Sequence, residues 1–362
     1  MIRVLVVDDS TFMRRSLAET LEKEKDIKVV DVAKDGVEAL QKAAAQEIDV
    51  ITLDVEMPRL NGLETLKRLM AENPLPVIMV SSLTEDGAES TLKALEYGAQ
   101  DFIPKTMSND KEAFGSELRR KVRALARRKS IVRLKYHRHS PAPEHAAREA
   151  APREPSRKAA PRKTLVGAAG KGARDLVVIG VSTGGPPVVQ KILSALPGDL
   201  PACILIAQHM PPAFTGPFAK RLDNVSKFTV TEAVHGDKLI NGRAYVCPGG
   251  KHIGLRLNGA LPEVSVTAEP KDALYKPTVN VLMETAGKIM GRKTLGVMLT
   301  GMGNDGVDGA KVLRDNGGLL IAQNEASCVV YGMPKAVVDA NLANLVLDAD
   351  DIAQAIVASV RG

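Results

Sequence analysis

The sequence contains no tryptophan, and aromatic residues make up only 3% of its 362 residues. Stacking of nucleic-acid bases needs exposed aromatic rings, so this composition argues against a surface that binds single-stranded nucleic acid. Cysteine is also scarce, since Cys203, Cys247 and Cys328 are odd in number and widely spaced. This pattern fits neither a disulfide framework nor the paired spacing of a zinc site, and it predicts a reducing, cytoplasmic environment.

Long apolar runs are missing as well. Residues 1–7 are largely apolar, but Asp8 and Asp9 end the run. That run is far shorter than the roughly 20 residues of a membrane-spanning helix, so we expect neither a signal peptide nor membrane insertion. With 44% hydrophobic residues the chain can still bury large cores, and its length predicts two domains.

A basic stretch separates the two halves of the chain. Residues 119–174 hold eighteen Lys and Arg against three Asp and Glu, so the rest of the chain is net acidic although the total is +6. Such a Pro- and Ala-rich composition buries too little apolar surface to fold alone. We interpret it as a solvated tether; binding of nucleic acid or of an acidic surface is the alternative. The predicted domains are then 1–128 and 175–362, with a linker at 129–174.

Apolar strands and helical stretches alternate in both predicted domains, as is typical of βα units around a parallel sheet. In the first domain we predict strands at 3–7, 28–33, 50–53, 77–81 and 101–103, with helices such as 12–24 and 37–45. Five such strands can close one flavodoxin-like domain. In the second we predict strands at 176–179, 202–207, 295–299 and 319–322, and hairpins within the turn-rich residues 228–257. The second fold is therefore expected to be doubly wound, mainly parallel α/β.

Carboxylates and a lysine follow strand ends in the first domain. Asp8 and Asp9 follow the first predicted strand, Asp54 the third and Lys105 the fifth. Because the carboxyl ends of parallel strands line one crevice, these groups would share a pocket, and Mg²⁺ would relieve the repulsion between the acids. Asp54 would then be a nucleophile toward phosphorus. The alternative is that each aspartate is a helix cap or an ordinary loop acid.

With Ser81 after the fourth strand and Phe102 near the lysine, this domain resembles the receiver domain of two-component response regulators. The resemblance implies that Asp54 accepts a phosphoryl group from a chemotaxis histidine kinase. It also implies that Ser81 and Phe102 occupy the hydroxyl and aromatic switch positions beside Lys105. Thr106 follows the lysine where receivers usually have proline, which departs from the family at a loop that normally holds a cis peptide.

The same resemblance implies the metal ligands. Asp9, Asp54 and the backbone carbonyl of Glu56 would bind Mg²⁺ directly, and Asp8 would reach it through water.

The second domain contains a candidate nucleophile. Residues 180–184 fit the pattern G-x-S-x-G, in which a sharp turn from strand to helix lifts Ser182 out of the sheet. Serine needs a base, and His209 and Asp305, each after another predicted strand, supply a base and an acid to orient it. The order Ser, His, Asp differs from that of α/β-hydrolases. Alternatively, Ser182 is only a helix N-cap, His209 a satisfied loop histidine and residues 300–306 a phosphate cradle.

The other histidines compete with His209 for the role of base. His235 and His252 fall in the predicted hairpin region and are expected to be turn or rim residues. The remaining three lie in the predicted linker, at His137, His139 and His145.

Residues 175–362 resemble the catalytic domain of chemotaxis protein-glutamate methylesterases, and the receiver and linker reproduce the architecture of that family. The resemblance rests on residues 179–186, 208–210, 297–306 and 322–334. It implies Ser182 as nucleophile, His209 as general base and then acid, Asp305 as its orienting group, and the Met302 backbone N–H as oxyanion donor.

The implied reaction is hydrolysis of glutamate γ-methyl esters on the cytoplasmic helices of chemoreceptors, with deamidation of glutamines as a second activity and no cofactor for the esterase step. Asn280 and Asn324 stand where the family usually has aspartate. We expect the unphosphorylated receiver to cover the catalytic site and phosphorylation to open it. The alternative function is a non-enzymatic adaptor that binds partners when phosphorylated.

Overall fold

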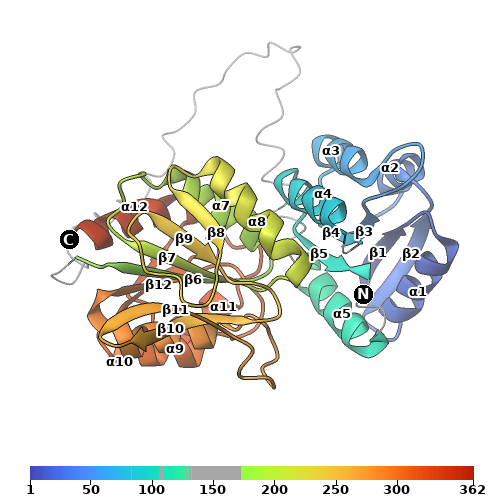
Figure 1. Cartoon of the computed structure of the whole chain (residues 1–362). Helices are drawn as coiled ribbons and strands as arrows, with labels where there is room; N and C mark the ends of the chain where they lie inside the picture. The colour runs from blue at the N-terminus through green and yellow to red at the C-terminus, as the bar shows by residue number, and fades with distance from the viewer. Residues whose placement is uncertain (83, 106–109, 128, 130–131, 133–172) are drawn as a thin grey trace, which may run out of the picture.

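A computed structural model describes residues 1–82, 84–105, 110–127, 129, 132 and 173–362, which form two α/β units that pack side by side (Figure 1). The predicted linker lies almost wholly outside these residues, as do Thr106 and the three linker histidines, so the domain boundaries stay predictions.

Among its described residues, the first unit contains five strands and five helices in alternation. In chain order they are β1 (Ile2–Val7), α1 (Thr11–Leu21), β2 (Ile27–Ala33), α2 (Gly36–Ala45), β3 (Val50–Asp54), α3 (Gly62–Glu72), β4 (Val77–Ser81), α4 (Glu85–Glu96), β5 (Asp101–Pro104) and α5 (Lys111–Ala126). Each predicted strand is found within two residues of its expected ends. Helix α1 ends three residues early, because the chain turns there to begin β2.

The five strands pair in parallel in the order β2-β1-β3-β4-β5. Side chains alternate across β1: Val4 and Val6 pack with α1 and α5, whereas Leu5 and Val7 face the core on the other side of the sheet. Because the strand order reverses between β1 and β3, their carboxyl ends open a crevice at that point. This crevice holds the acid pocket.

The second unit begins at Leu176. Its elements are β6 (Leu176–Val181), α7 (Gly185–Ala195), β7 (Cys203–Gln208), α8 (Pro212–Val225), β8 (Thr229–Glu232), β9 (Arg243–Val246), β10 (His252–Asn258), β11 (Leu261–Thr267), α9 (Val279–Met290), the 3-10 helix η2 (Gly291–Lys293), β12 (Thr294–Met298), α10 (Val307–Asp315), β13 (Leu319–Gln323), α11 (Met333–Asp339), β14 (Leu345–Leu347) and α12 (Ala349–Arg361).

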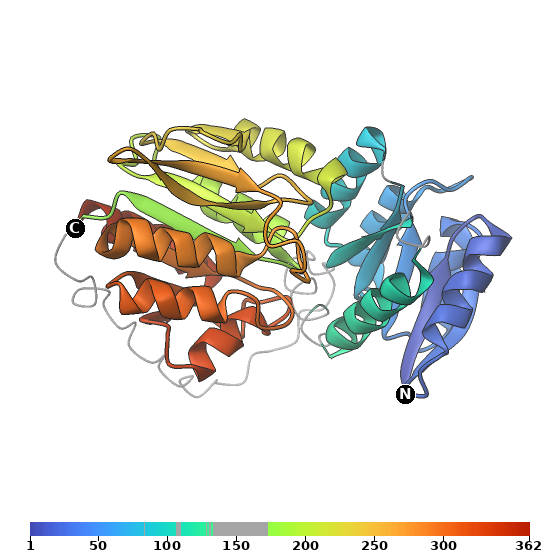
Figure 2. The same cartoon turned by 60° about the horizontal axis from the view of Figure 1, so that its bottom comes forward.

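A seven-stranded parallel sheet, in the order β14-β13-β12-β6-β7-β9-β8, divides this unit into layers. Helices α7, α8 and α12 cover one face, and α9, α10 and α11 cover the other together with the β10–β11 hairpin (Figures 1 and 2). The chain proceeds from β6 outward to β7 on one side and later returns to β12 on the other. The switch point of the sheet therefore lies at the end of β6, where Ser182 begins the next turn.

The prediction for residues 228–257 was partly wrong. Strands β8 and β9 pair in parallel, so the turn at Asn241 and Gly242 does not close a hairpin between them. The antiparallel hairpin lies later, between β10 and β11. The connection from β8 to β9 is long enough for β9 to insert between β7 and β8 in the sheet, and a local turn signal does not report that choice.

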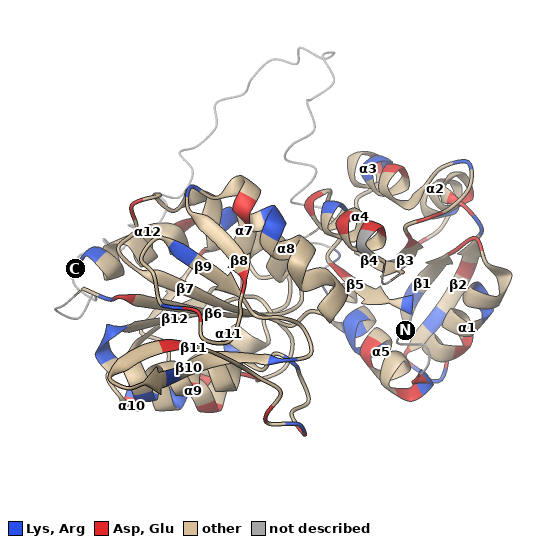
Figure 3. Ribbon diagram, viewed as in Figure 1, with Lys and Arg blue, Asp and Glu red and all other residues tan. Residues whose placement is uncertain are grey.

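The two units meet through β5, α4 and α5 of the first and through α7, α8 and the loops at the end of β6 in the second. Phe102 stacks on Phe214 of α8 with ring centroids 4.4 Å apart, which joins the two hydrophobic cores. Around these rings, Glu96 accepts hydrogen bonds from Gln190 and Arg221. In the view of Figure 3, acidic and basic residues are interspersed along the helices of both units.

Candidate phosphoacceptor and active sites

The acid pocket forms as predicted from the strand ends. Ligand oxygens of Asp8, Asp9 and Asp54 all lie within 4.8 Å of one another. The Lys105 ammonium lies 2.7 Å from Asp54 Oδ2 and 3.0 Å from Asp8 Oδ2. Asp8 is fully buried, Asp54 is 3% exposed, and Asp9 and Glu56 face solvent at the mouth of the pocket. The structure thus brings a nucleophile candidate, two further acids and one cation together.

The electrostatics of this pocket fit a divalent cation. Burial raises the pKa of Asp54 to about 6, the charge of Asp8 acts in the same direction, and Lys105 opposes both. Asp8 Oδ2 is buried and accepts no hydrogen bond within the described residues, although the Lys105 ammonium is close. An oxygen-only set of donors suits Mg²⁺, whose charge would keep these carboxylates ionised.

Ser81 and Phe102, two other residues that the sequence assigned to the receiver site, make their contacts with α4 and with the second unit. Ser81 Oγ donates to the carbonyl of Gly87 and accepts from Thr91, so within the described residues its hydroxyl is held by α4 rather than by Asp54. Phe102 points out of the first unit, onto Phe214. Phe102, which the sequence predicts at the aromatic switch position, therefore forms part of the contact between the units.

The turn that carries Ser182 is tight. Gly184 has a φ of 74°, in the left-handed region, and a Cβ there would lie 2.3 Å from the Cβ of Val329. The Ser182 N–H donates to the Thr300 carbonyl, and a Cβ on Gly301 would lie 2.8 Å from that of Ser182. Only glycine allows these loops to approach so closely. Prolines occupy the first turn of α7, as the sequence indicated.

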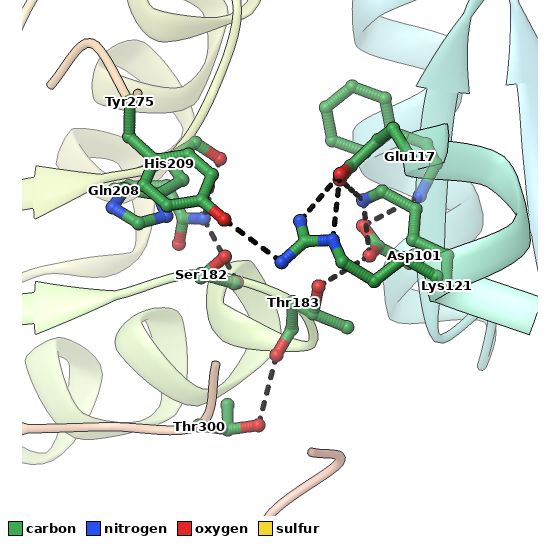
Figure 4. A network of polar contacts seen from close by, with 11 residues as sticks. Asp101, Glu117, Lys121, Ser182, Thr183, Gln208, His209, Tyr275 and Thr300 are labelled. Carbon is green, nitrogen blue, oxygen red and sulfur yellow. Dashed lines mark hydrogen bonds and ion pairs between the residues drawn. The ribbon is translucent and has the colours of Figure 1, made fainter. Parts of the chain in front are cut away.

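His209 lies directly beside this turn, because β6 and β7 are neighbouring strands and the His209 N–H donates to the Val181 carbonyl. Its Nε2 is 2.7 Å from Asp305 Oδ2. An ionised carboxylate only accepts, so Nε2 carries the proton. Nδ1 is then the basic nitrogen, and it is buried without a hydrogen-bond partner among the described residues. Figure 4 shows His209 and Ser182 on the same side of the strand ends.

Asp305 is held at the N-terminus of α9. The Thr278 hydroxyl donates to Oδ1, and the backbone N–H groups of Val279 and Asn280 donate to Oδ2 and Oδ1 at 2.7 and 3.3 Å. Burial opposes ionisation of Asp305, but the bonds from His209, Thr278 and Val279 outweigh it and keep the pKa of this carboxyl below its usual value. The start of a helix favours a negative charge in the same way.

Asn280 has a structural role at this position. Its side-chain oxygen accepts hydrogen bonds from the N–H groups of Gly306 and Gly309, at 3.1 and 2.9 Å. The loop that carries Asp305 is therefore tied to α9 from both sides. Asn324, the second departure from the family pattern, accepts hydrogen bonds from Ser327 and donates to Asp348.

Met302 begins the same loop after β12. Its backbone N–H donates to no acceptor within the described residues, and its side chain is 8% exposed. Together with the close approach of Gly301 to Ser182, this geometry fits a donor for an oxyanion.

The sequence did not identify four residues near the site. The Tyr275 ring stacks on His209 with centroids 4.3 Å apart, and Arg120 of α5 donates to its hydroxyl at 3.0 Å (Figure 4). Thr278 bonds Asp305, as described above. His252 was predicted to be a rim residue, which is wrong: it is fully buried behind α9, because β10 packs against that helix.

Besides the contact of Arg120 with Tyr275, a second contact between the units lies next to Ser182. Thr183, next to Ser182, donates from its hydroxyl to Asp101 of β5 at 2.7 Å, and Lys121 of α5 pairs with the same carboxylate (Figure 4). In this arrangement Ser182 is 8% and Asp305 7% exposed. A cavity of about 680 Å³ lies beside the contact, between α5 and the loops that hold Met302 and residues 329–332.

None of the helices that the structure describes combines the length and apolar character that crossing a membrane requires.

Comparisons with known proteins match both halves of the chain. The family model described as CheB methylesterase matches residues 177–356, and that of the response regulator receiver domain matches residues 4–113. A protein-glutamate methylesterase/protein-glutamine glutaminase of Lawsonia intracellularis is 53% identical over 365 residues, which cover 99% of each chain. A protein of the same name, numbered 2, from Nitratidesulfovibrio vulgaris is 55% identical over 98% of each chain.

A solved structure matches the second unit. The crystal structure of the Thermotoga maritima CheB methylesterase catalytic domain is 39% identical with a TM-score of 0.50, and the match covers 52% of this chain and 99% of that one. By its family matches and by identity along nearly its whole length, the chain belongs to the CheB methylesterase family, with a receiver domain in front of a methylesterase domain.

Proposed function

We propose that this protein is a phosphorylation-regulated protein-glutamate methylesterase and protein-glutamine glutaminase that acts on the cytoplasmic domains of chemoreceptors. The observation that supports it most strongly is the buried hydrogen bond from His209 to Asp305 at the strand ends next to Ser182. The name shared by relatives that match the whole chain supports the choice of substrate.

The proposed reaction uses a covalent intermediate. Ser182 Oγ attacks the γ-carbonyl carbon of the methyl ester while His209 Nδ1 takes its proton, and the oxyanion that forms is held by the Met302 N–H. Collapse of this intermediate expels methoxide, which leaves as methanol after protonation by His209. Water then attacks the acyl-enzyme by the same steps to give glutamate. With a glutamine substrate the leaving group is ammonia.

Asp305 has a separate part in this reaction. Its carboxylate accepts from Nε2, which fixes the tautomer that leaves Nδ1 basic, and it stabilises the imidazolium after proton transfer. Its own low pKa keeps it ionised throughout.

The esterase is tested by release of labelled methanol from a methyl-labelled chemoreceptor cytoplasmic fragment. The phosphorylated wild-type protein is expected to release it, and Ser182→Ala, which keeps the fold, is expected to lose at least a thousandfold in rate. Equal release by both proteins would refute Ser182 as nucleophile. No release by the wild type would favour the non-enzymatic adaptor.

We propose that the receiver restrains this site when it is unphosphorylated. The support is that Asp101 and Arg120 contact Thr183 and Tyr275, the direct neighbours of Ser182 and His209. A receiver that separates from the catalytic domain would break both contacts and expose the nucleophile. Phosphorylation then acts by shifting the population toward that separated state.

The receiver pocket is proposed to bind Mg²⁺ through Asp9, Asp54 and the Glu56 carbonyl, with Asp8 bonded to a metal-bound water. The ion would neutralise the charge of the incoming phosphoryl group. Asp54 would accept that group from a chemotaxis histidine kinase, beside Lys105. We place the protein in the cytoplasm, where kinase and receptor helices meet, and propose that it needs neither nucleic acid nor membrane insertion.

A further inference from the structure

A second histidine lies behind the Asp305 carboxylate. His252 is fully buried at the start of β10. Its Nδ1 accepts the Thr278 backbone N–H at 3.1 Å, and its Nε2 lies 3.2 Å from the Pro270 carbonyl oxygen. Both ring nitrogens are therefore engaged, one as acceptor and one as donor. This arrangement requires the neutral imidazole, with its proton on Nε2.

Thr278 connects this histidine to the proposed active site. Its N–H donates to His252, and its hydroxyl donates to Asp305 Oδ1. The other carboxylate oxygen, Oδ2, accepts from His209 and from the Val279 N–H. A continuous series of hydrogen bonds thus runs from His252 through Thr278 and Asp305 to His209.

The series fixes the direction of the carboxylate. Four donors converge on two oxygens, so rotation of the carboxyl group would break at least one bond to a buried donor. If His252 took up a proton, Nδ1 would become a donor and would face the Thr278 N–H, with no acceptor between them. The start of α9, and with it Asp305, would then have to move.

We propose that Thr278 and His252 are positioning residues of the esterase, which hold Asp305 in the direction that binds His209. This inference rests on the proposed function. Burial keeps the pKa of His252 below its ordinary value. The hydrogen bond to the Pro270 carbonyl opposes this shift, as do the charges of Asp305 and Glu269, while Lys276 acts in the same direction as burial. His252 is therefore neutral near pH 7 and becomes protonated only as the pH falls.

The first test replaces the hydroxyl of Thr278 in the full chain, with a small phosphodonor present. Thr278→Val keeps the shape of the side chain but removes the hydroxyl donor. The kcat for methanol release is expected to fall about tenfold to a hundredfold, which is the range for loss of one hydrogen bond to a charged group. The KM is expected to change less than twofold. Thr278→Ser keeps the hydroxyl and is expected to stay within about threefold of the wild type.

The pH profile separates positioning from mere stability. Without the Thr278 hydroxyl, Asp305 loses one of the hydrogen bonds that lower its pKa, so the acid limb of kcat is expected to move to higher pH in Thr278→Val. The charged and titratable groups facing His209 are Asp305, Tyr275 and, through the tyrosine, Arg120, and none of them changes in this variant. A residue that only supports the fold would lower kcat without that shift.

The second test addresses His252. The wild type is expected to lose activity at acid pH as His252 takes up a proton and the start of α9 moves. His252→Asn keeps a carbonyl acceptor but cannot be protonated, so its acid limb is expected to be less steep than that of the wild type and to lie at lower pH. His235→Asn is the matched control, since His235 is exposed and its ring hydrogen-bonds Val266, away from Asp305. Its profile is expected to equal that of the wild type.

Methanol release above the Ser182→Ala background establishes the proposed function itself. If the wild type shows that release, the inference is overturned when Thr278→Val has a kcat within twofold of the wild type and an acid limb that has not moved. Should that variant fail to fold, as judged by circular dichroism, the profile of His252→Asn decides: a limb identical to that of the wild type would overturn the role of His252.

Discussion

Replacing Arg120 with alanine is expected to raise the esterase activity of the unphosphorylated protein. Arg120 is a residue of the receiver helix α5, and its Nη1 donates to the Tyr275 hydroxyl at 3.0 Å. The tyrosine in turn lies over His209. Removal of the guanidinium therefore weakens the packed arrangement without a change to any proposed catalytic residue.

The expected rise in basal activity can be worked out from the solvent exposure of the hydrogen bond between Arg120 and Tyr275. A hydrogen bond to a charged group contributes roughly 1.5–3 kcal/mol when fully buried. The Arg120 side chain is 30% exposed, so solvent reduces this to about 1 kcal/mol. That energy changes the ratio of packed to separated protein about fivefold. While the packed state dominates, basal activity follows the separated fraction and is expected to rise by the same factor.

The assay compares initial rates of methanol release without a phosphodonor. Arg123→Ala is the matched control, because Arg123 lies one turn along α5 but pairs with Glu24 and Asp26 inside the receiver. It is expected to leave the basal rate within twofold of the wild type. An unchanged rate in Arg120→Ala, or an equal rise in both variants, would refute the role given to the contact with Tyr275.

Three further outcomes are expected. Asp54→Asn is expected to keep the basal rate but to lose the increase that a small phosphodonor produces; a retained increase would place the phosphoryl group elsewhere. Because the pKa of Asp54 is about 6, protons compete with Mg²⁺ for this carboxylate below pH 6. The Kd for Mg²⁺, measured by calorimetry, is expected to rise about tenfold per pH unit in that range. A constant Kd for Mg²⁺ between pH 7 and 5 would contradict the proposal that the ion binds in this pocket. Gly184→Ala is expected to cost at least about 1–2 kcal/mol in the free energy of unfolding, because a side chain in the left-handed region is strained and its Cβ would meet Val329; an unshifted denaturation midpoint would argue against the tight turn.

The parallel strands could be predicted because each is a short apolar run bounded by turns, and burial on both faces leaves that pattern in the sequence. The candidate residues could be placed for the same reason. Asp54, Ser182 and His209 each come directly after such a run, and parallel topology gathers those positions at one edge.

The β8–β9 pair was predicted wrongly because a turn signal is local. Residues 241–242 favour a turn, but whether the next strand pairs beside its predecessor or inserts elsewhere depends on the sheet that is already formed. The burial of His252 was missed for a similar reason. It lies at the start of a half-exposed strand, and its ring is engaged by Pro270 and Thr278, which lie in the segment before α9.

By itself the sequence determined the central parallel strands, the order of the candidate groups and the turns that only glycine permits, because these depend on neighbours a few residues apart. Only the tertiary structure decided which donors surround Asp305 and which ring covers His209. It also decided that α5 of the first unit contacts the second unit. Arg120 and Tyr275 are 155 positions apart, and no periodicity or motif joins residues that meet only when two domains pack.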